Sequence, residues 1–133
     1  MFRKIPLKSS TKLRLLIVDD EPSIRTLLAH ALVRSGYCVQ SCAGGLSALS
    51  TIRQEIPDIL LSDLNMPGMS GFELLAIIHQ RFPGIKTIAM SGAYSGTDMP
   101  AGVVADAFYG KGTNFRALTE ILDAMVVVPR ARC

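Results

Sequence analysis

Five short apolar runs alternate with amphipathic segments along this chain of 133 residues, and that alternation constrains the fold more than any other feature. Each run is four to six residues long, which suits a strand that is buried on both faces. Strands of this kind, separated by helices, predict an α/β fold in which helices cover both faces of a parallel sheet. The expected strands span 13–18, 37–42, 59–62, 85–90 and 103–108.

Capping and breaking residues indicate where the helices lie. Pro22 suits a first helical turn and Gly36 a helix end, while Ser70 and Glu73 form a capping box. The stretch 92–102 holds three glycines and one proline, so we expect at most a short or irregular fourth helix there. The architecture predicted is a (βα)5 doubly wound, five-stranded parallel sheet. Its other helices are expected over about 22–35, 46–55 and 70–82, and from a Thr113 cap to about Met125.

The net charge of +3 is unevenly distributed. Seven of the fourteen basic residues lie in 1–14 and 130–132, which hold no acid, so 15–129 carries seven bases and eleven acids, a net charge of −4. A basic chain suggests nucleic acid or a membrane surface as partner, but this body is acidic, so we expect neither. The organisation predicted is a basic N-terminal tail (1–11), one domain (12–126) and a C-terminal tail (127–133).

Cysteine usage and hydropathy indicate the compartment. No apolar run approaches the ~18 residues of a membrane span, and no apolar stretch follows the basic N-terminus as it would in a secretory signal. The three cysteines are an odd number, which argues for a reducing environment. We therefore expect a cytoplasmic protein.

Four of the five predicted strands are followed by a polar residue that can take part in chemistry: Asp19 and Asp20, Asp63, Ser91, and Lys111. Parallel strands bring their carboxyl ends to one edge of the sheet, where ligands bind. Carboxylates at ~4 Å repel each other by about 4 kcal/mol per pair, so a cation is needed, and oxygen ligands suit Mg²⁺. With a lysine for phosphate and a carboxylate nucleophile, the pattern favours phosphoryl transfer onto one Asp.

Helix capping is the plainer explanation of Asp19 and Asp20, because acids are favourable near a helix N-terminus. Capping does not explain why Asp63, Ser91 and Lys111 stand at the ends of the other predicted strands.

These residues, together with the motif D-x-x-M-P-x-M-x-G from Asp63 to Gly71, resemble the receiver domain of two-component response regulators, a CheY-like family with a flavodoxin-like fold. The resemblance covers about residues 12–126. It implies that Asp63 is the phosphoacceptor and that Lys111 pairs with the phosphate.

The resemblance also implies a metal site and a switch. Side chains of Asp20 and Asp63 and the backbone carbonyl of Asn65 would hold Mg²⁺, with Asp19 acting through water. Ser91 stands where the family has Ser or Thr. Phe108, three residues before Lys111, takes the aromatic switch position, which is often Tyr.

Two departures from the family are visible. Gly112 follows the lysine where the family has Pro, often after a cis bond, so we expect a trans bond and a differently shaped loop, because cis bonds before other residues cost ~2.5–4 kcal/mol. The segment 92–102 falls where the family places the fourth helix of its usual partner or dimer face. We therefore expect a monomer or a weak dimer.

The function predicted is that of a stand-alone receiver in a phosphorelay, phosphorylated by a histidine kinase or a histidine phosphotransfer protein and acting on a downstream protein target. It would be a phosphoacceptor with self-phosphorylation and self-dephosphorylation chemistry and not an enzyme. Two alternatives stay open: an interaction module that phosphate does not regulate, and a receiver cut from a longer hybrid kinase or response regulator. A D-x-D phosphatase is disfavoured, because Asn65 stands where the second acid would be.

Overall fold

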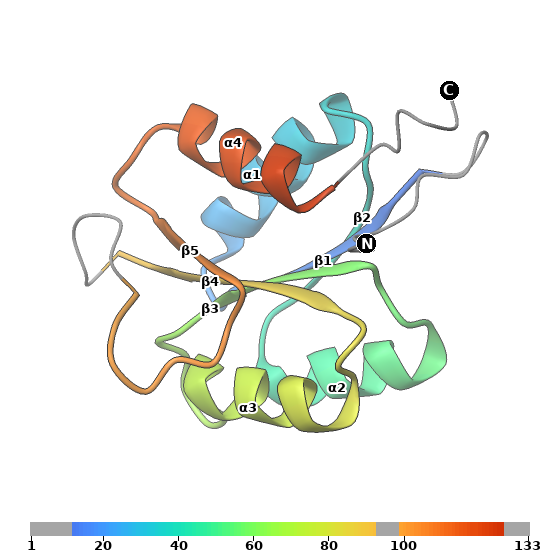
Figure 1. Cartoon of the computed structure of the whole chain (residues 1–133), viewed down its shortest axis with the longest axis vertical. Coiled ribbons are helices and arrows are strands. Elements are labelled where there is room, and N and C mark those ends of the chain that lie inside the picture. The colour runs from blue at the N-terminus through green and yellow to red at the C-terminus, as the bar shows by residue number, and fades with distance from the viewer. Residues whose placement is uncertain (1–11, 93–98, 127–133) are drawn as a thin grey trace.

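The computed structural model describes residues 12–92 and 99–126, and these form one five-stranded sheet with helices on both faces (Figure 1). All strand pairs are parallel, in the order β2-β1-β3-β4-β5. The predicted α/β class and doubly wound sheet are confirmed. The strands are β1 (Arg14–Val18), β2 (Cys38–Cys42), β3 (Ile59–Asp63), β4 (Lys86–Ser91) and β5 (Ala107–Gly110). The described helices are α1 (Pro22–Arg34), α2 (Gly45–Gln54), α3 (Gly71–Arg81) and α4 (Phe115–Met125).

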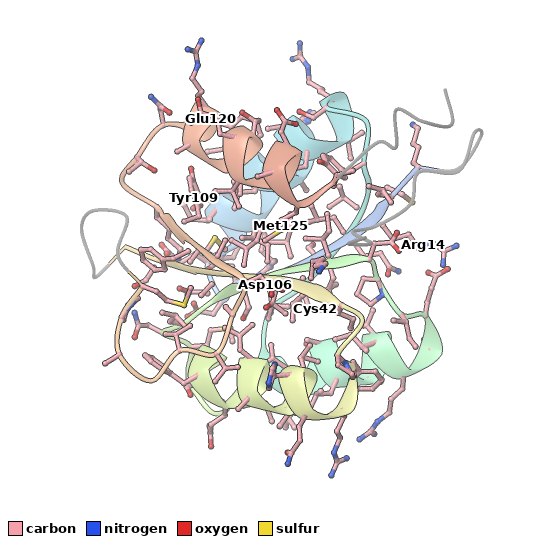
Figure 2. The ribbon with its side chains drawn as sticks, in the orientation of Figure 1. Arg14, Cys42, Asp106, Tyr109, Glu120 and Met125 are labelled. Atoms are coloured by element: carbon pink, nitrogen blue, oxygen red, sulfur yellow. The ribbon has the colours of Figure 1, made fainter. Side chains whose placement is uncertain are left out.

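Two apolar clusters separate the sheet from its helices. Helices α1 and α4 cover one face, and α2 and α3 cover the other (Figure 1). Side chains alternate along each strand, so Ile17, Leu61 and Tyr109 belong to the α1–α4 cluster while Leu60 and Phe108 belong to the α2–α3 cluster. Tyr109 and Met125 are labelled on the α4 side in Figure 2. The same alternation decides which way the residues at the strand ends point.

Most helix signals act as predicted. Proline stands at the start of α1. The Ser70 hydroxyl accepts a hydrogen bond from the Glu73 N–H, and the Glu73 carboxylate accepts one from the Ser70 N–H, so the capping box is confirmed. Asn114, and not Thr113, caps the last helix by accepting from the Ala117 N–H. The Thr113 hydroxyl donates instead to the Gly110 carbonyl.

The predicted fifth strand over 103–108 is wrong in its position, because β5 begins only at Ala107. Asp106 starts the pairing: its N–H donates to the Thr87 carbonyl, and its carboxylate accepts from the Thr87 N–H at 2.8 Å. Val103 and Ala105 lie outside the sheet and pack against the α2–α3 cluster. Their apolar character therefore serves a packed connection and not a strand.

The expected short or irregular fourth helix falls partly on residues 93–98, which lie outside the described residues, as do the predicted tails 1–11 and 127–133. Residues 99–106 contain no helix, and Gly102 adopts a φ of +86° in a turn. Within the described ranges, no helix has both the length and the apolarity to cross a membrane.

Candidate functional site

The hydrogen-bond ladder of the sheet continues past the strand ends and fixes the backbone of the predicted site. The Asp19 N–H donates to the Cys42 carbonyl at 3.1 Å, and the Lys111 N–H donates to the Ser91 carbonyl at 3.0 Å. Asp63 is itself the last residue of β3. Because side chains alternate, Asp19, Asp63 and Lys111 all continue the face that is covered by α1 and α4.

Three carboxylates and one ammonium group meet at this edge. One carboxylate oxygen each of Asp19, Asp20 and Asp63 lies within 4.8 Å of the others, and Asp20 is the least buried of the three. The Lys111 Nζ lies 2.9 Å from Asp19 Oδ2 and 3.3 Å from Asp63 Oδ1. The structure thus brings together the four charged residues that the sequence singled out, with Asp19 fully buried and Asp63 3% exposed.

Asp19 is held firmly in place, and one of its carboxylate oxygens makes an ion pair but, within the part of the chain that the structure describes, no hydrogen bond. Its Oδ1 accepts a hydrogen bond from the Glu21 N–H at 2.9 Å, and its backbone carbonyl accepts one from the Arg25 guanidinium at 2.7 Å. Its buried Oδ2 receives no hydrogen bond among the described residues, although Lys111 is close enough for an ion pair. A buried carboxylate oxygen of this kind fits a cation or a cation-bound water.

Burial and the neighbouring charges act on the pKa values of both Asp63 and Lys111, and both values are raised. Burial is the main cause that raises the pKa of Asp63; Lys111 lowers it, Asp19 raises it, and hydrogen bonds from Lys111 and Asn65 lower it. For Lys111, burial is the largest single influence and lowers the pKa, but Asp19 and Asp63 together outweigh burial and raise it. Lys111 therefore stays protonated at neutral pH, while burial keeps the pKa of Asp63 above its ordinary value despite the nearby ammonium.

The loop after Asp63 leads into α3, whose first residue, Gly71, lies against the backbone of Asp63. The Gly71 N–H donates to the Leu64 carbonyl at 3.0 Å. A Cβ at Gly71 would overlap the Asp63 carbonyl oxygen and would lie only 2.6 Å from the Leu64 Cα. The last position of the D-x-x-M-P-x-M-x-G motif thus needs glycine because α3 begins directly against the backbone of Asp63.

Asn65 and Ser91 face each other across the site. The Asn65 side-chain amide donates to the Ser91 hydroxyl at 3.1 Å, and Ser91 is fully buried while Asn65 is exposed. The sequence pointed to the Asn65 backbone carbonyl, so this side-chain contact is an addition. It connects the loop that follows β3 to the end of β4.

Phe108 is buried in β5, paired in register with Ala89 of β4. Strand alternation directs its side chain to the same face of the sheet as Ser91, two residues after Ala89. Phe108 also lines a hollow of about 520 Å³ beside α4, together with Met99 and Ile121. Phe108 thus belongs to the α2–α3 cluster on the face of the sheet that Ser91 shares, and it stands in the edge strand that borders the hollow.

The loop that carries Lys111 is formed without a cis bond, because every described peptide bond, including Lys111–Gly112, is trans, as predicted. The aliphatic part of Lys111 lies over Gly92, with its Cδ 3.7 Å from where a Cβ would stand. The ammonium nevertheless reaches both Asp19 and Asp63. Gly112 in place of proline does not withdraw the lysine from the site.

Sequence reasoning missed two residues of the site. Glu21, interpreted only as part of a helix start, places its Oε1 3.4 Å from the Lys111 Nζ. Arg25, one turn further along α1, holds the Asp19 carbonyl. Their spacing after the acidic pair was the available signal, because residues at the start of a helix that follows a strand lie beside the end of that strand.

Comparisons with known proteins agree with this geometry. The family model for the response regulator receiver domain matches residues 15–122. The sporulation initiation phosphotransferase F of Bacillus subtilis is 40% identical over 86 residues, which cover 65% of this chain and 68% of that protein. The DNA-binding transcriptional regulator NtrC of Escherichia coli is 42% identical over 82 residues, covering 62% of this chain. The match spans only 17% of the length of NtrC.

A solved structure shows the same fold. The response regulator TrrA of Thermotoga maritima, in complex with Mg²⁺ and beryllofluoride, superposes with a TM-score of 0.79 at 32% identity, covering 87% of this chain and all of TrrA. TrrA has also been solved in complex with the histidine kinase ThkA. Because the family model covers most of the chain and the fold agrees, the chain belongs to the response regulator receiver domain family.

Proposed function

We propose that Asp63 accepts a phosphoryl group from the phosphohistidine of a histidine kinase or a histidine phosphotransfer protein, in a Mg²⁺-dependent reaction. One observation carries the proposal: the Asp63 carboxylate is almost fully buried at the strand edge, 3.3 Å from the Lys111 ammonium and within 4.8 Å of two other carboxylates. No helix cap or structural ion pair requires such a cluster.

In the transfer, a carboxylate oxygen of Asp63 forms a bond to phosphorus while the bond from phosphorus to the donor imidazole nitrogen breaks, and its electron pair stays on that nitrogen. Lys111 is protonated and adjacent, so it would donate to a phosphoryl oxygen and offset the developing charge. The Ser91 hydroxyl, now bonded to the Asn65 amide, would turn toward another phosphoryl oxygen.

Asp20, Asp63 and the backbone carbonyl of Asn65 would hold the Mg²⁺, and Asp19 would act through a bound water. The buried Asp19 Oδ2, which lacks a hydrogen bond, fits this role. When bound, Mg²⁺ neutralises the clustered acids and orients the transferred phosphoryl group.

The output would be a contact with a downstream protein, or onward transfer of the phosphoryl group, in the cytoplasm. Phe108 lies in the edge strand β5, on the same face of the sheet as Ser91, and is among the residues that border the hollow beside α4, which supports a readout through that edge of the sheet. A phosphotransferase and a kinase-bound regulator among the relatives support a histidine kinase as partner. The protein would thus act as a phosphoacceptor that catalyses its own labelling and its own hydrolysis, and not as an enzyme on a separate substrate.

Intact-mass spectrometry after incubation with Mg²⁺ and a small phosphodonor tests the proposal. The parent protein should gain one phosphoryl group, and Asp63→Asn should gain none. Asp123→Asn is the matched control, because it removes an exposed carboxylate on α4, away from the strand edge, and it should be labelled like the parent. Equal labelling of Asp63→Asn and the parent would show that the phosphoacceptor is another residue.

A further inference from the structure

The Lys111 ammonium is surrounded by carboxylates before any phosphoryl group arrives. An ammonium has three N–H donors, and Lys111 Nζ has three carboxylate neighbours: Asp19 at 2.9 Å, Asp63 at 3.3 Å and Glu21 at 3.4 Å. A phosphoryl oxygen on Asp63 must therefore compete with these carboxylates for the ammonium.

Glu21 is the neighbour that can leave. The Asp19 side chain is fully buried and makes the shortest contact, and Asp63 is the residue that carries the phosphoryl group. The Glu21 side chain is 58% exposed and makes the longest contact. An exposed carboxylate regains water when it turns away, so its displacement costs little compared with that of a buried one.

The Glu21 side chain also has no structural task that would tie it to the site. It occupies the N-cap position of α1 but makes no capping hydrogen bond there. The bond that Glu21 gives to Asp19 comes from its backbone N–H, which does not depend on the side chain. The contact with Lys111 is thus the only described interaction of this carboxylate that a substitution would remove.

We propose that Glu21 is a positioning residue that competes with the phosphoryl group for Lys111. The inference rests on the function proposed above. In the unphosphorylated protein the Glu21 carboxylate holds the ammonium near the mouth of the site, and on phosphorylation a phosphoryl oxygen takes its place. The negative charge of Glu21 also repels the incoming anion. Both effects act in the same direction and weaken the capture of a phosphoryl group.

Beryllofluoride binding at saturating Mg²⁺ tests this competition, with the apparent Kd read from the ¹⁹F resonances of the bound fluorides. Glu21→Gln should bind beryllofluoride roughly threefold to tenfold more tightly than the parent, since it removes one nearby charge that is partly screened by solvent. The gain should shrink as ionic strength rises. Glu120→Gln makes the same change on α4 (Figure 2) and should leave the affinity unchanged.

Unchanged or weaker binding by Glu21→Gln would overturn the proposal, and weaker binding is the result expected if Glu21 instead helps to hold Mg²⁺ or to position Lys111. Glu21→Asp keeps the charge on a shorter side chain and should bind more tightly than the parent. If it equals the parent while the Gln variant binds more tightly, direct competition for the ammonium is refuted.

A ligand-free measurement checks the contact itself. In protein labelled with ¹⁵N-lysine, the ε-ammonium resonance of Lys111 should shift in Glu21→Gln and stay in place in Glu120→Gln; no shift in Glu21→Gln would refute the contact. Failure of the parent to bind beryllofluoride would contradict the proposed function as a whole. Normal binding by the parent with no change in Glu21→Gln would contradict only the role given to Glu21.

Discussion

Replacing Asp63 with Asn should stabilise the metal-free protein at neutral pH, although it removes the candidate phosphoacceptor. The Asp63 carboxylate is buried among acids that a single ammonium only partly neutralises. Asparagine has nearly the same shape and carries no charge. Without a bound cation, the buried carboxylate lowers the stability of the folded protein, and replacing it with a neutral side chain removes that cost.

The distances give the size of the effect. Repulsion from the buried Asp19, within 4.8 Å, is at least ~3.5 kcal/mol at an effective dielectric near 20, and repulsion from the less buried Asp20 is reduced by solvent. Attraction to Lys111 at 3.3 Å returns ~5 kcal/mol. These charges nearly cancel, so the cost that remains is mainly the burial of the carboxylate, which is also the main cause of its raised pKa. A burial cost of about 2 kcal/mol corresponds to a rise in Tm of roughly 6–10 °C for a domain of this size.

The pH dependence has a definite sign. Burial raises the pKa of Asp63 in the folded protein above its ordinary value of 3.8. Below that ordinary value the carboxyl is protonated in both states, so the substitution gains nothing. As pH rises through the folded-state pKa, the parent loses stability that Asp63→Asn keeps, so the gap between the two proteins should open with rising pH.

Thermal unfolding followed by circular dichroism measures this gap at several pH values, with and without Mg²⁺. Adding Mg²⁺ should narrow the gap, because the metal stabilises the parent more. Asp123→Asn is the control and should stay within about 0.5 kcal/mol of the parent. An Asp63→Asn protein that is no more stable than the parent at pH 7, or a gap that persists in acid, would refute the electrostatic reasoning.

Three further outcomes are expected. Gly71→Ala should lower the free energy of unfolding by at least ~2 kcal/mol in denaturant unfolding, because its Cβ has no room against the Asp63 backbone. Gly112→Ala, which has open space around it, should lower it by less than about 0.5 kcal/mol. Similar losses in the two variants would contradict the Gly71 contact. Lys111→Met should bind Mg²⁺ roughly tenfold more tightly by calorimetry, because the ammonium no longer competes for the carboxylates, and weaker binding would contradict that competition. Ser70→Ala should cost about 1 kcal/mol through the lost capping box, and unchanged unfolding would show that the box is not stabilising.

The sheet was predictable because most of its strands come from short apolar runs that fit few other structures. The run 59–62 holds three consecutive large apolar residues and stops at Asp63, and a run this short, with a turn signal before it and an acid after it, favours a strand over a helix. The run 103–108 was misplaced because Val103 and Ala105 are apolar for a different reason. They cover the α2–α3 cluster from a connecting segment, and composition does not distinguish a packed connection from a strand.

The site was predictable where it depends on backbone register alone. Asp63 ends β3 and Lys111 follows β5, with β4 between them, so a parallel sheet brings both residues to one edge whatever rotamers their side chains adopt. The contacts of Glu21 and of the Asn65 amide depend on side-chain rotamers, which no periodicity reports. The choice of Asn114 over Thr113 as the helix cap has a similar cause, because both residues can accept and only local geometry selects one.

The contact between Gly71 and the backbone of Asp63 gives the pocket one closely packed wall. On one side, the Asp63 peptide and the first turn of α3 touch without a gap, so neither can shift alone. On the other side, Ser91 and Lys111 belong to β4 and the end of β5, next to the hollow beside α4. We therefore expect the α3 side of the pocket to stay in place when a phosphoryl group binds, so that any displacement falls on the side of Ser91 and Lys111.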